Sequence, residues 1–582
     1  MTIKAKLITS CAKNKSTDAR VYLLTTLHFL ISLFWEKSVF IFRTDWTEWK
    51  QQGFWLTDIR ATYISDGAES IIVYILSRFF SAMLIYVFWK TIFIVVDKNA
   101  SKETVSIFKN IFFVIFIIGI ISYPQSFGLE IDNYGNYSRA IRFLPIYWQS
   151  VFTGAFYAAC MMALPSWVGI LFFQSVLFVL TIGYVFEKLE KLFPKRKAKY
   201  ALLLVFILPE TYEILFNPYR NNFYTTLCLF YYSNLFFLYV ESREKGEVAL
   251  SRKYDIVFVF SSALIMIWRS EGIILGVSGL LVYLLLFRKR KFVQYLLMII
   301  CFVMVFLGMW WCQQIGTRKY YGNDYSIVNT PNILYNIFND KNANLAYEGA
   351  VNDIQAISKV VPSQILKESG LEGFRNYNWT LGRKDFNQTL ATDEEAINYM
   401  KAYYRIVYHN FEDYLKVQIN CFFKSMRIPV LFPTHIYTGK TFTPLERFQY
   451  NFAVTDPAEI YQGNITGWWL SNYFRQNTYA IINKLNSAWK KLWLHSCAYM
   501  IIHLFAIVTD IYILILCLFR MFHKEKRWYG IFAILFFSII GEIAGIFLFM
   551  PEGRPQYLYP MLYSSYLLIY LYTLEVAASE QH

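Results

Sequence analysis

Apolar runs of nearly membrane-spanning length recur along most of the chain, and short polar stretches separate them. Thirteen such segments lie at about 21–42, 70–96, 108–123, 149–164, 167–186, 201–216, 223–240, 255–268, 272–287, 293–312, 496–518, 530–550 and 558–576. A bilayer core is crossed by roughly 20 apolar residues in a helix. A spanning segment must also satisfy its own backbone hydrogen bonds. The pattern predicts an all-α polytopic membrane protein with about 12–13 hydrophobic segments.

The stretch 313–495 interrupts this pattern with mixed polar and apolar residues and many turn-forming ones. Within it, 393–418 is expected to be an amphipathic helix that Thr392 and Asp393 open. A stretch of this length has room for a small domain, and we expect a mixed, mainly helical insertion. The predicted organisation is 1–104, a basic tail with two spans; 105–312, the core membrane domain; 313–495, the insertion; and 496–582, the C-terminal spans.

Composition and charge support this interpretation and indicate a topology. Of the 582 residues, 56% are hydrophobic and 17% charged, whereas soluble domains carry about 25% charged residues. The net charge of +15 is concentrated between apolar segments, at 188–200, 241–254, 288–291 and 520–528. This distribution is typical of cytoplasmic loops and excludes nucleic acid as a partner. It predicts a multi-pass cell-membrane protein with a cytoplasmic N-terminus and an extracytoplasmic insertion.

Thirteen complete crossings would not keep all of these basic loops on one side. The segment 149–164 is short, rich in small residues and followed by Pro165. We expect it to be a re-entrant or half-buried helix rather than a span. The loop 125–150 before it would then lie on the outer face.

With this topology, several arginines lie on the side where positive charge is unusual. Arg220, Arg269 and Arg554 each sit between two apolar segments, and Arg139 belongs to the loop 125–150. Charges at the lipid boundary are costly and therefore point to function. A simpler alternative is a salt bridge to a neighbouring residue, since Glu271 and Glu552 each lie two positions from an arginine. Guanidinium groups bind phosphate oxygens in a bidentate manner.

The same predicted outer boundary carries carboxylates and aromatic side chains. Carboxylates can accept a proton from an attacking hydroxyl or hold a divalent cation. Aromatic rings suit sugars, although an ordinary aromatic belt would look the same. The acidic candidates are Glu130, Asp132 and Glu210, and the aromatic ones are Tyr134, Tyr137, Tyr147 and Trp148. Together with the arginines they suggest one polar site for a lipid-borne phosphate.

Short motifs in this order resemble a known family. An apolar span is followed by Tyr123–Pro124, the acidic loop, "LPIYWQSVFTGAFY" from Leu144 and, near the end, "PEGRPQYLYPML" from Pro551. This is similar to the GT-C superfamily of integral-membrane glycosyltransferases, above all to bacterial members with extra N-terminal spans. The resemblance covers 105–312 and 496–576. The chain departs from it in having Tyr147–Trp148 where many members have a histidine, and Pro555–Gln556 within the late arginine–tyrosine motif.

The resemblance implies transfer of a sugar from a polyprenyl-phosphate donor to a glycan, lipid or protein acceptor of the cell envelope. Asp132 would be the general base or metal-holding carboxylate, and Glu130 would support it. Some members need a divalent cation such as Mg²⁺ or Mn²⁺, and others do not. Arg220, Arg269, Arg554 and Arg139 are the candidates for the lipid phosphate. The candidates for substrate contact are Tyr134, Tyr137, Tyr147, Trp148, Glu210, Glu271, Glu552 and Tyr557.

Two alternatives belong to other classes. A polysaccharide polymerase or O-antigen-ligase-like enzyme also combines a large outer loop with functional arginines. A lipid or glycan transporter would usually show internal symmetry between its halves, and no matched halves are visible in this sequence.

Overall fold

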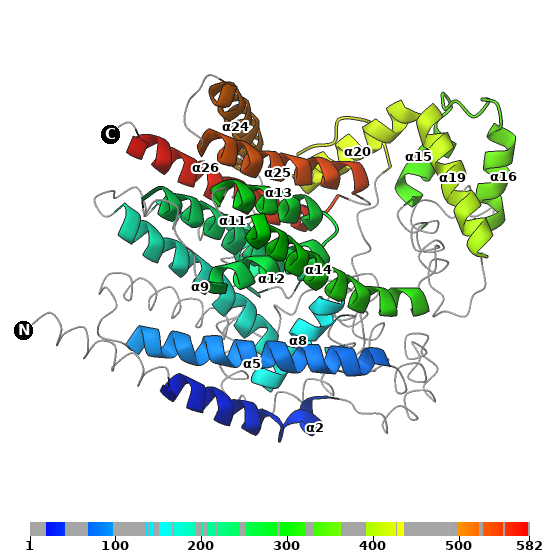
Figure 1. Ribbon diagram of the computed structural model, residues 1–582. Helices are drawn as coiled ribbons and strands as arrows, with labels where there is room; N and C mark the ends of the chain where they lie inside the picture. The colour runs from blue at the N-terminus through cyan, green and yellow to red at the C-terminus, as the bar shows by residue number, and fades with distance from the viewer. Residues whose placement is uncertain are drawn as a thin grey trace, which may run out of the picture.

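The protein is a bundle of helices with a helical insertion at one end (Figure 1). The computed structural model describes residues 19–40, 68–96, 136, 140–141, 143, 150–165, 168–193, 201–202, 204, 208–216, 219–244, 252–287, 292–320, 327, 330–361, 392–426, 428–435, 488, 497–522, 528–550 and 553–579. All regular secondary structure in these ranges is helical. The prediction of a helical membrane protein is confirmed at this level.

Within the described residues, six helices are long and apolar enough to cross a membrane. These segments are Ser70–Phe93, Gly169–Leu192, Arg220–Ser242, Phe292–Gln314, Ile501–Met521 and Trp528–Phe549. They belong to α5 (Ala68–Val96), α9 (Val168–Leu192), α11 (Arg220–Glu244), α14 (Phe292–Tyr320), α24 (Cys497–Phe522) and α25 (Trp528–Phe549). The sequence predicted about twice as many hydrophobic segments, because several apolar runs form shorter helices. An apolar helix that packs inside a protein does not need full spanning length.

The shorter helices fill the bundle around α11, its most enclosed spanning helix. Helices α12 (Arg252–Trp268) and α13 (Gly272–Leu286) form a hairpin beside α11, and α26 (Tyr559–Ser579) packs along it. Helices α14 and α24 instead expose apolar side chains such as Leu296, Phe505 and Val508. This distribution fits a bundle whose outer helices contact lipid.

Helix α8 (Val151–Ala163) is buried along its whole length but has only thirteen residues. At 1.5 Å per residue it is about 20 Å long, too short for a hydrocarbon core of about 30 Å. This length agrees with the expectation that 149–164 does not span. The preceding apolar segment at 108–123 lies outside the described residues.

Both ends of α8 are capped by side chains, because a helix that stops inside the protein leaves unpaired backbone groups. At its N-terminus, Ser150 Oγ accepts from the Phe152 amide at 3.3 Å, and Gln313 of α14 accepts from the Val151 amide. At its C-terminus, the Trp35 indole donates to the Met162 carbonyl at 2.9 Å. The His28 ring also donates to the Ala163 carbonyl, at 2.8 Å. In the hydrocarbon core of a membrane, no water is present to form hydrogen bonds with such backbone groups.

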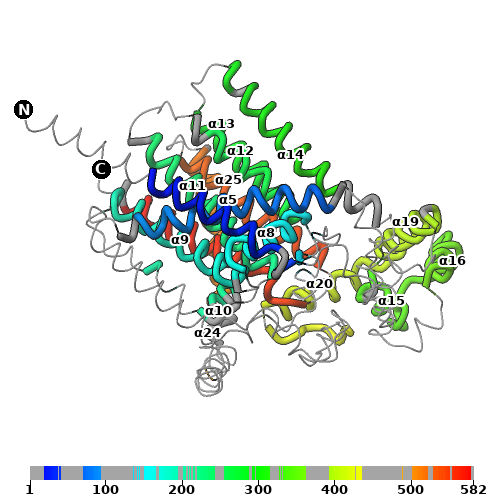
Figure 2. The backbone as a smooth tube through the Cα atoms, turned by 90° about the horizontal axis from the view of Figure 1, so that it is seen from below, coloured from blue at the N-terminus to red at the C-terminus, as the bar shows by residue number. Residues whose placement is uncertain are grey.

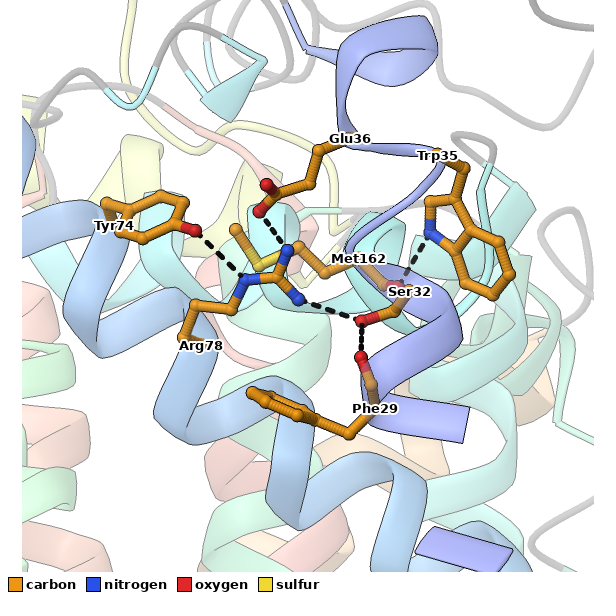
Figure 3. A network of polar contacts seen from close by, with 7 residues as sticks. All are labelled: Phe29, Ser32, Trp35, Glu36, Tyr74, Arg78 and Met162. Carbon is orange, nitrogen blue, oxygen red and sulfur yellow. Dashed lines mark hydrogen bonds and ion pairs between the residues drawn. The ribbon is translucent and has the colours of Figure 1, made fainter. Parts of the chain in front are cut away.

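A buried arginine holds the N-terminal helices in position for this capping (Figure 3). Arg78 of α5 donates to Ser32 Oγ at 2.8 Å and forms an ion pair with Glu36, the first residue of α2 (Glu36–Val39). Its guanidinium also lies 5.4 Å from the centre of the Phe29 ring and 5.7 Å from that of Tyr74. A charge at this depth is tolerated when it is paired and hydrogen-bonded. The network therefore fixes the first helix (Ala19–Ser32) against α5.

Helix ends that border the basic stretches contact one another in pairs. Lys188, near the end of α9, pairs with Glu241 near the end of α11. Arg520, near the end of α24, contacts the Tyr529 hydroxyl at the start of α25. The ends of α9 and α11 that border the basic stretches 188–200 and 241–254 therefore lie side by side, as do the ends of α24 and α25 that border 520–528. Which side of the membrane these ends face stays a prediction.

The insertion contributes α15 (Pro331–Asn339), α16 (Ala350–Val360), α19 (Asp393–His409) and α20 (Phe411–Ser425). A capping box of Thr392 and Glu395 starts α19, as the sequence predicted. The predicted single helix 393–418 is wrong in one respect, because Asn410 breaks it. The Asn410 side chain accepts from the Asn344 amide at 2.6 Å and donates to the Ile406 carbonyl at 2.9 Å. Such side-chain bonds compete with the helical ladder.

Helix α20 fixes the insertion to the end of the bundle opposite the basic loops. Tyr414 and Gln418 donate to the Leu548 carbonyl at 2.7 and 3.1 Å, at the C-terminus of α25. Gly553 permits a close approach, because a Cβ there would lie 2.8 Å from Lys424 Cβ. Figure 2 shows α15, α16 and α19 beyond α20, away from the bundle.

We predict that Trp35→Phe lowers the thermal stability of the protein in detergent. It leaves the Met162 carbonyl without its indole donor, and an unsatisfied buried group costs about 1–3 kcal/mol. Trp89→Phe is the matched control, since the buried indole N–H of Trp89 makes no hydrogen bond within the described residues. Equal melting temperatures for both variants would show that this cap contributes nothing.

Candidate functional site

Three connections that are far apart in sequence meet at the end of the bundle that carries the insertion. They are the start of α11 after α10 (Pro209–Phe216), the turn between α12 and α13, and the segment between α25 and α26. Asn221 joins them: its Oδ1 accepts from Arg269, and its Nδ2 donates to the Gln556 carbonyl at 3.1 Å. The Trp268 indole also donates to the Arg220 carbonyl at 3.2 Å.

Arg269 is the centre of this arrangement and is only 7% exposed. Its Nη2 lies 2.6 Å from Glu271 Oε1, and its Nε lies 3.1 Å from Oε2. Its guanidinium also lies 5.6 Å from the centre of the Tyr557 ring and 5.9 Å from that of Tyr224. The salt bridge that the sequence offered as the simpler alternative is thus present. One fork of Arg269 is occupied, and a phosphate would have to replace Glu271 to use it.

Glu271 lies in the turn between α12 and α13 and keeps part of its side chain accessible. Burial by itself raises the pKa of this carboxyl, but the Arg269 guanidinium outweighs that effect. The pKa falls from its usual 4.5 to about 2, and the nearby charge of Arg220 contributes to this. Glu271 is therefore an anion at neutral pH, and the site contains a charged pair rather than a free cation.

The remaining predicted residues of this region fall into two places. Arg554 is half-buried just before the short helix η5 (Pro555–Tyr557), and Tyr557 lies against Arg269. The structure thus brings Arg220, Arg269, Arg554 and Tyr557 to one end of the bundle. Glu210 instead lies buried in the first turn of α10, where it interacts with Tyr566 of α26.

Most of the predicted catalytic loop lies outside the described residues, as does Glu552. The loop residues concerned are Glu130, Asp132, Tyr134, Tyr137, Arg139, Tyr147 and Trp148. Their roles, including that of Asp132 or Glu130 toward a cation, stay predictions. Among the described residues, no group of three or more His, Cys, Asp or Glu side chains could hold a metal ion.

The described part of this loop packs on the N-terminal helices. Phe143 stacks on Phe40 with the ring centres 4.7 Å apart, and it meets Tyr74 edge to face at 5.2 Å. Its φ of 54° is unusual for a residue other than glycine, and such a conformation persists only where packing imposes it. Because Tyr74 also contacts Arg78, the buried arginine network supports this loop.

The structure reveals charged residues that the sequence interpretation missed. Glu542 in α25 and Asp510 in α24 are completely buried in segments of spanning length. Arg78 and Glu36 form the ion pair of Figure 3. The signal was present, because a lone ionisable residue within an apolar run is a functional candidate by default.

Comparisons with protein-family models, curated proteins and solved structures find no match to this chain.

We predict that the stability advantage of the native protein over Glu271→Gln decreases as the pH is lowered from about 4.5 toward about 2. The folded pKa of about 2 lies below the usual 4.5. The carboxylate therefore stabilises the fold fully above 4.5, and this contribution disappears as the pH falls toward 2. Melting temperatures of both proteins at several pH values test this. A difference that grows on acidification would contradict the ion pair.

Proposed function

We propose that this chain is a membrane glycosyltransferase of the GT-C type. It transfers a sugar from a polyprenyl-phosphate donor to a cell-envelope acceptor at the extracytoplasmic face. One observation carries the proposal beyond the sequence resemblance. Of the arginines predicted to bind phosphate, Arg220, Arg269 and Arg554 come from three separate connections, and these three lie at the end of the bundle where the insertion is fixed.

The chemistry of that end suits a lipid-borne anion. A donor of this type keeps its polyprenyl chain in the hydrocarbon core and its phosphate at the boundary, and the ends of the spanning helices lie at that depth. Arg220 and Arg554 flank the Arg269–Glu271 pair at this level. Arginine is the side chain best suited to phosphate oxygens. In this proposal Arg269 mainly positions the three connections, while Arg220 and Arg554 bind the donor phosphate.

The proposed reaction is a single displacement, which inverts the anomeric centre. The acceptor hydroxyl loses its proton to the Asp132 carboxylate, and its oxygen forms a bond to the anomeric carbon. The bond from that carbon to the phosphate oxygen breaks, and polyprenyl phosphate leaves with the electron pair. The arginines stabilise the charge that develops on the leaving phosphate. A divalent cation at Asp132 or Glu130 would assist the same step.

The insertion would bind the acceptor above this site. It is helical where the structure describes it, and α20 seats it directly on the end of α25. An acceptor held there would meet the donor where the arginines lie.

The direct test is transfer from radiolabelled polyprenyl-phosphate sugars by the purified protein in liposomes, with release of polyprenyl phosphate as the readout. Asp132→Asn should abolish release in a protein that still folds. Arg554→Gln should weaken donor use about tenfold or more, since a hydrogen bond to a charged group is worth about 1.5–3 kcal/mol. Arg520→Gln is the matched control, because Arg520 lies at the opposite end, next to Tyr529.

The proposal would be wrong if the native protein released polyprenyl phosphate from none of the donors. Equal losses in Arg554→Gln and Arg520→Gln would remove the phosphate role from this end of the bundle. Use of lipid-linked oligosaccharides alone would favour the polymerase or ligase class instead.

A second prediction concerns the side of the membrane. Ser270 is exposed in the turn between α12 and α13, and Lys191 is exposed in the last turn of α9 at the other end. In a cysteine-free protein, Ser270→Cys should react with a membrane-impermeant thiol reagent on intact cells. Lys191→Cys should react only after the cells are opened. The reverse pattern would place the arginines in the cytoplasm and exclude this donor chemistry.

A further inference from the structure

Glu542 lies about two-thirds of the way along α25, within a spanning segment, and its side chain is inaccessible to solvent. Neither carboxyl oxygen has a hydrogen-bond partner within the described residues. An ionised carboxylate at such a position is very unfavourable unless it is paired. This residue takes no part in the proposed transfer reaction, and its burial calls for a separate explanation.

The surroundings of Glu542 connect it to the Arg269–Glu271 pair. Both of these charges act electrostatically on the Glu542 carboxyl, and so does the Leu275 amide in the first turns of α13. Gly541 allows α25 to approach α13, because a Cβ there would lie 3.1 Å from Ile274. Glu542 therefore faces the positive N-terminal end of α13, where a negative charge is favoured.

Tyr224 borders the same place. Its hydroxyl is buried and interacts with Cys228, one turn later on α11. It lies beside Gly272, where an added Cβ would be 2.8 Å from the hydroxyl oxygen. A buried carboxyl without a side-chain partner is rare, since buried polar groups are normally satisfied.

Polar groups continue from Glu542 toward the interior. Ser538, one turn earlier on α25, lies 2.8 Å from the Tyr232 hydroxyl of α11. Tyr232 interacts electrostatically with both Glu542 and Asp510 of α24. Toward the end of the bundle that carries the arginines, Glu271 is the charged residue near Glu542 whose side chain is partly accessible.

We propose that Glu542 is a proton-binding site within the helix bundle. Binding converts the carboxylate to the neutral acid, with solvent as the source of the proton. In the neutral form of Glu542, Glu271 is the carboxylate that balances the charge of Arg269. In the charged form, the positive charge of Arg269 is shared between two carboxylates, and the end of α13 helps to stabilise the added charge. This proposal does not depend on the transfer of a sugar.

Other titratable groups around Glu542 influence whether its carboxyl is charged or neutral. Tyr224, Cys228 and Tyr232 of α11 face it, as do Arg269 and Glu271 beside α13. On α24, Asp510 lies near Ser565 of α26, and Tyr566 of α26 contacts His503. Arg269 is the nearest cation that acts on Glu542, and Glu271 opposes it. Removal of the Arg269 charge should therefore strengthen proton binding by Glu542, and removal of the Glu271 charge should weaken it.

Reaction with N,N′-dicyclohexylcarbodiimide tests the proposal in native membranes. This apolar reagent modifies only protonated carboxyls: the acid proton moves to a carbodiimide nitrogen, and the carboxyl oxygen bonds to the central carbon. Mass spectrometry should find the adduct on Glu542, with labelling that declines as the pH rises. Glu542→Gln should lose this adduct, whereas Asp510→Asn should keep it.

Charge variants test the coupling to Arg269. Glu271→Gln should move the pH of half-maximal labelling down by about one unit, and Arg269→Gln should move it up, as neighbouring charges do. Infrared difference spectra between acidic and alkaline pH provide a measurement that needs no reagent access. A protonated-carboxyl band should titrate in the native protein and vanish in Glu542→Gln. The proposal is overturned if that band persists in the variant, or if the two charge variants leave the midpoint unchanged.

Discussion

Helix ends that stop within a membrane protein leave carbonyl and amide groups that water cannot reach. Satisfying these groups is the constraint that orders this structure. Helix α8 ends inside the bundle, and His28 of the first helix and Trp35, just before α2, donate hydrogen bonds to its last carbonyls. At the other end of the molecule, Tyr414 and Gln418 of the insertion cover the Leu548 carbonyl of α25. Segments distant in sequence are thereby brought into contact by hydrogen bonds to the backbone groups of single helix termini.

The same logic explains the part that Arg269 plays in the fold. Its guanidinium satisfies Glu271 and Asn221, and Asn221 in turn satisfies a carbonyl of the segment between α25 and α26. Removing such a group leaves several buried partners unpaired, which costs more than the bond itself contributes. Flanking arginines at this end are then positioned by a rigid frame. A frame of this kind suits the recognition of a charged headgroup at a fixed depth.

Two kinds of buried charge coexist in the bundle. Arg78 and Glu36 neutralise each other between the N-terminal helices, and the surrounding hydrogen bonds complete the arrangement. Within the described residues, Glu542 lacks such an ion-pair partner, and the Arg269 charge that acts on it already pairs with Glu271. A buried pair that is fully hydrogen-bonded holds one arrangement, whereas an unpaired buried carboxylate is unfavourable and favours the protonated form. The first pair is therefore architectural, and the second group is suited to binding a proton.

Apolar periodicity and the position of basic residues were sufficient to predict a helical membrane protein and to locate the connections with Arg220, Arg269 and Arg554. They were sufficient because a membrane-spanning segment needs a continuous apolar stretch and cytoplasmic loops are enriched in Lys and Arg, and both features are visible in a short stretch of sequence. The sequence could not distinguish spanning helices from shorter buried ones, since both are equally apolar. Nor could it show that Arg269 would be paired, that Asn410 would divide a helix, or that Glu542 would face α13. Those outcomes depend on which distant segments meet, and only the tertiary structure decides that.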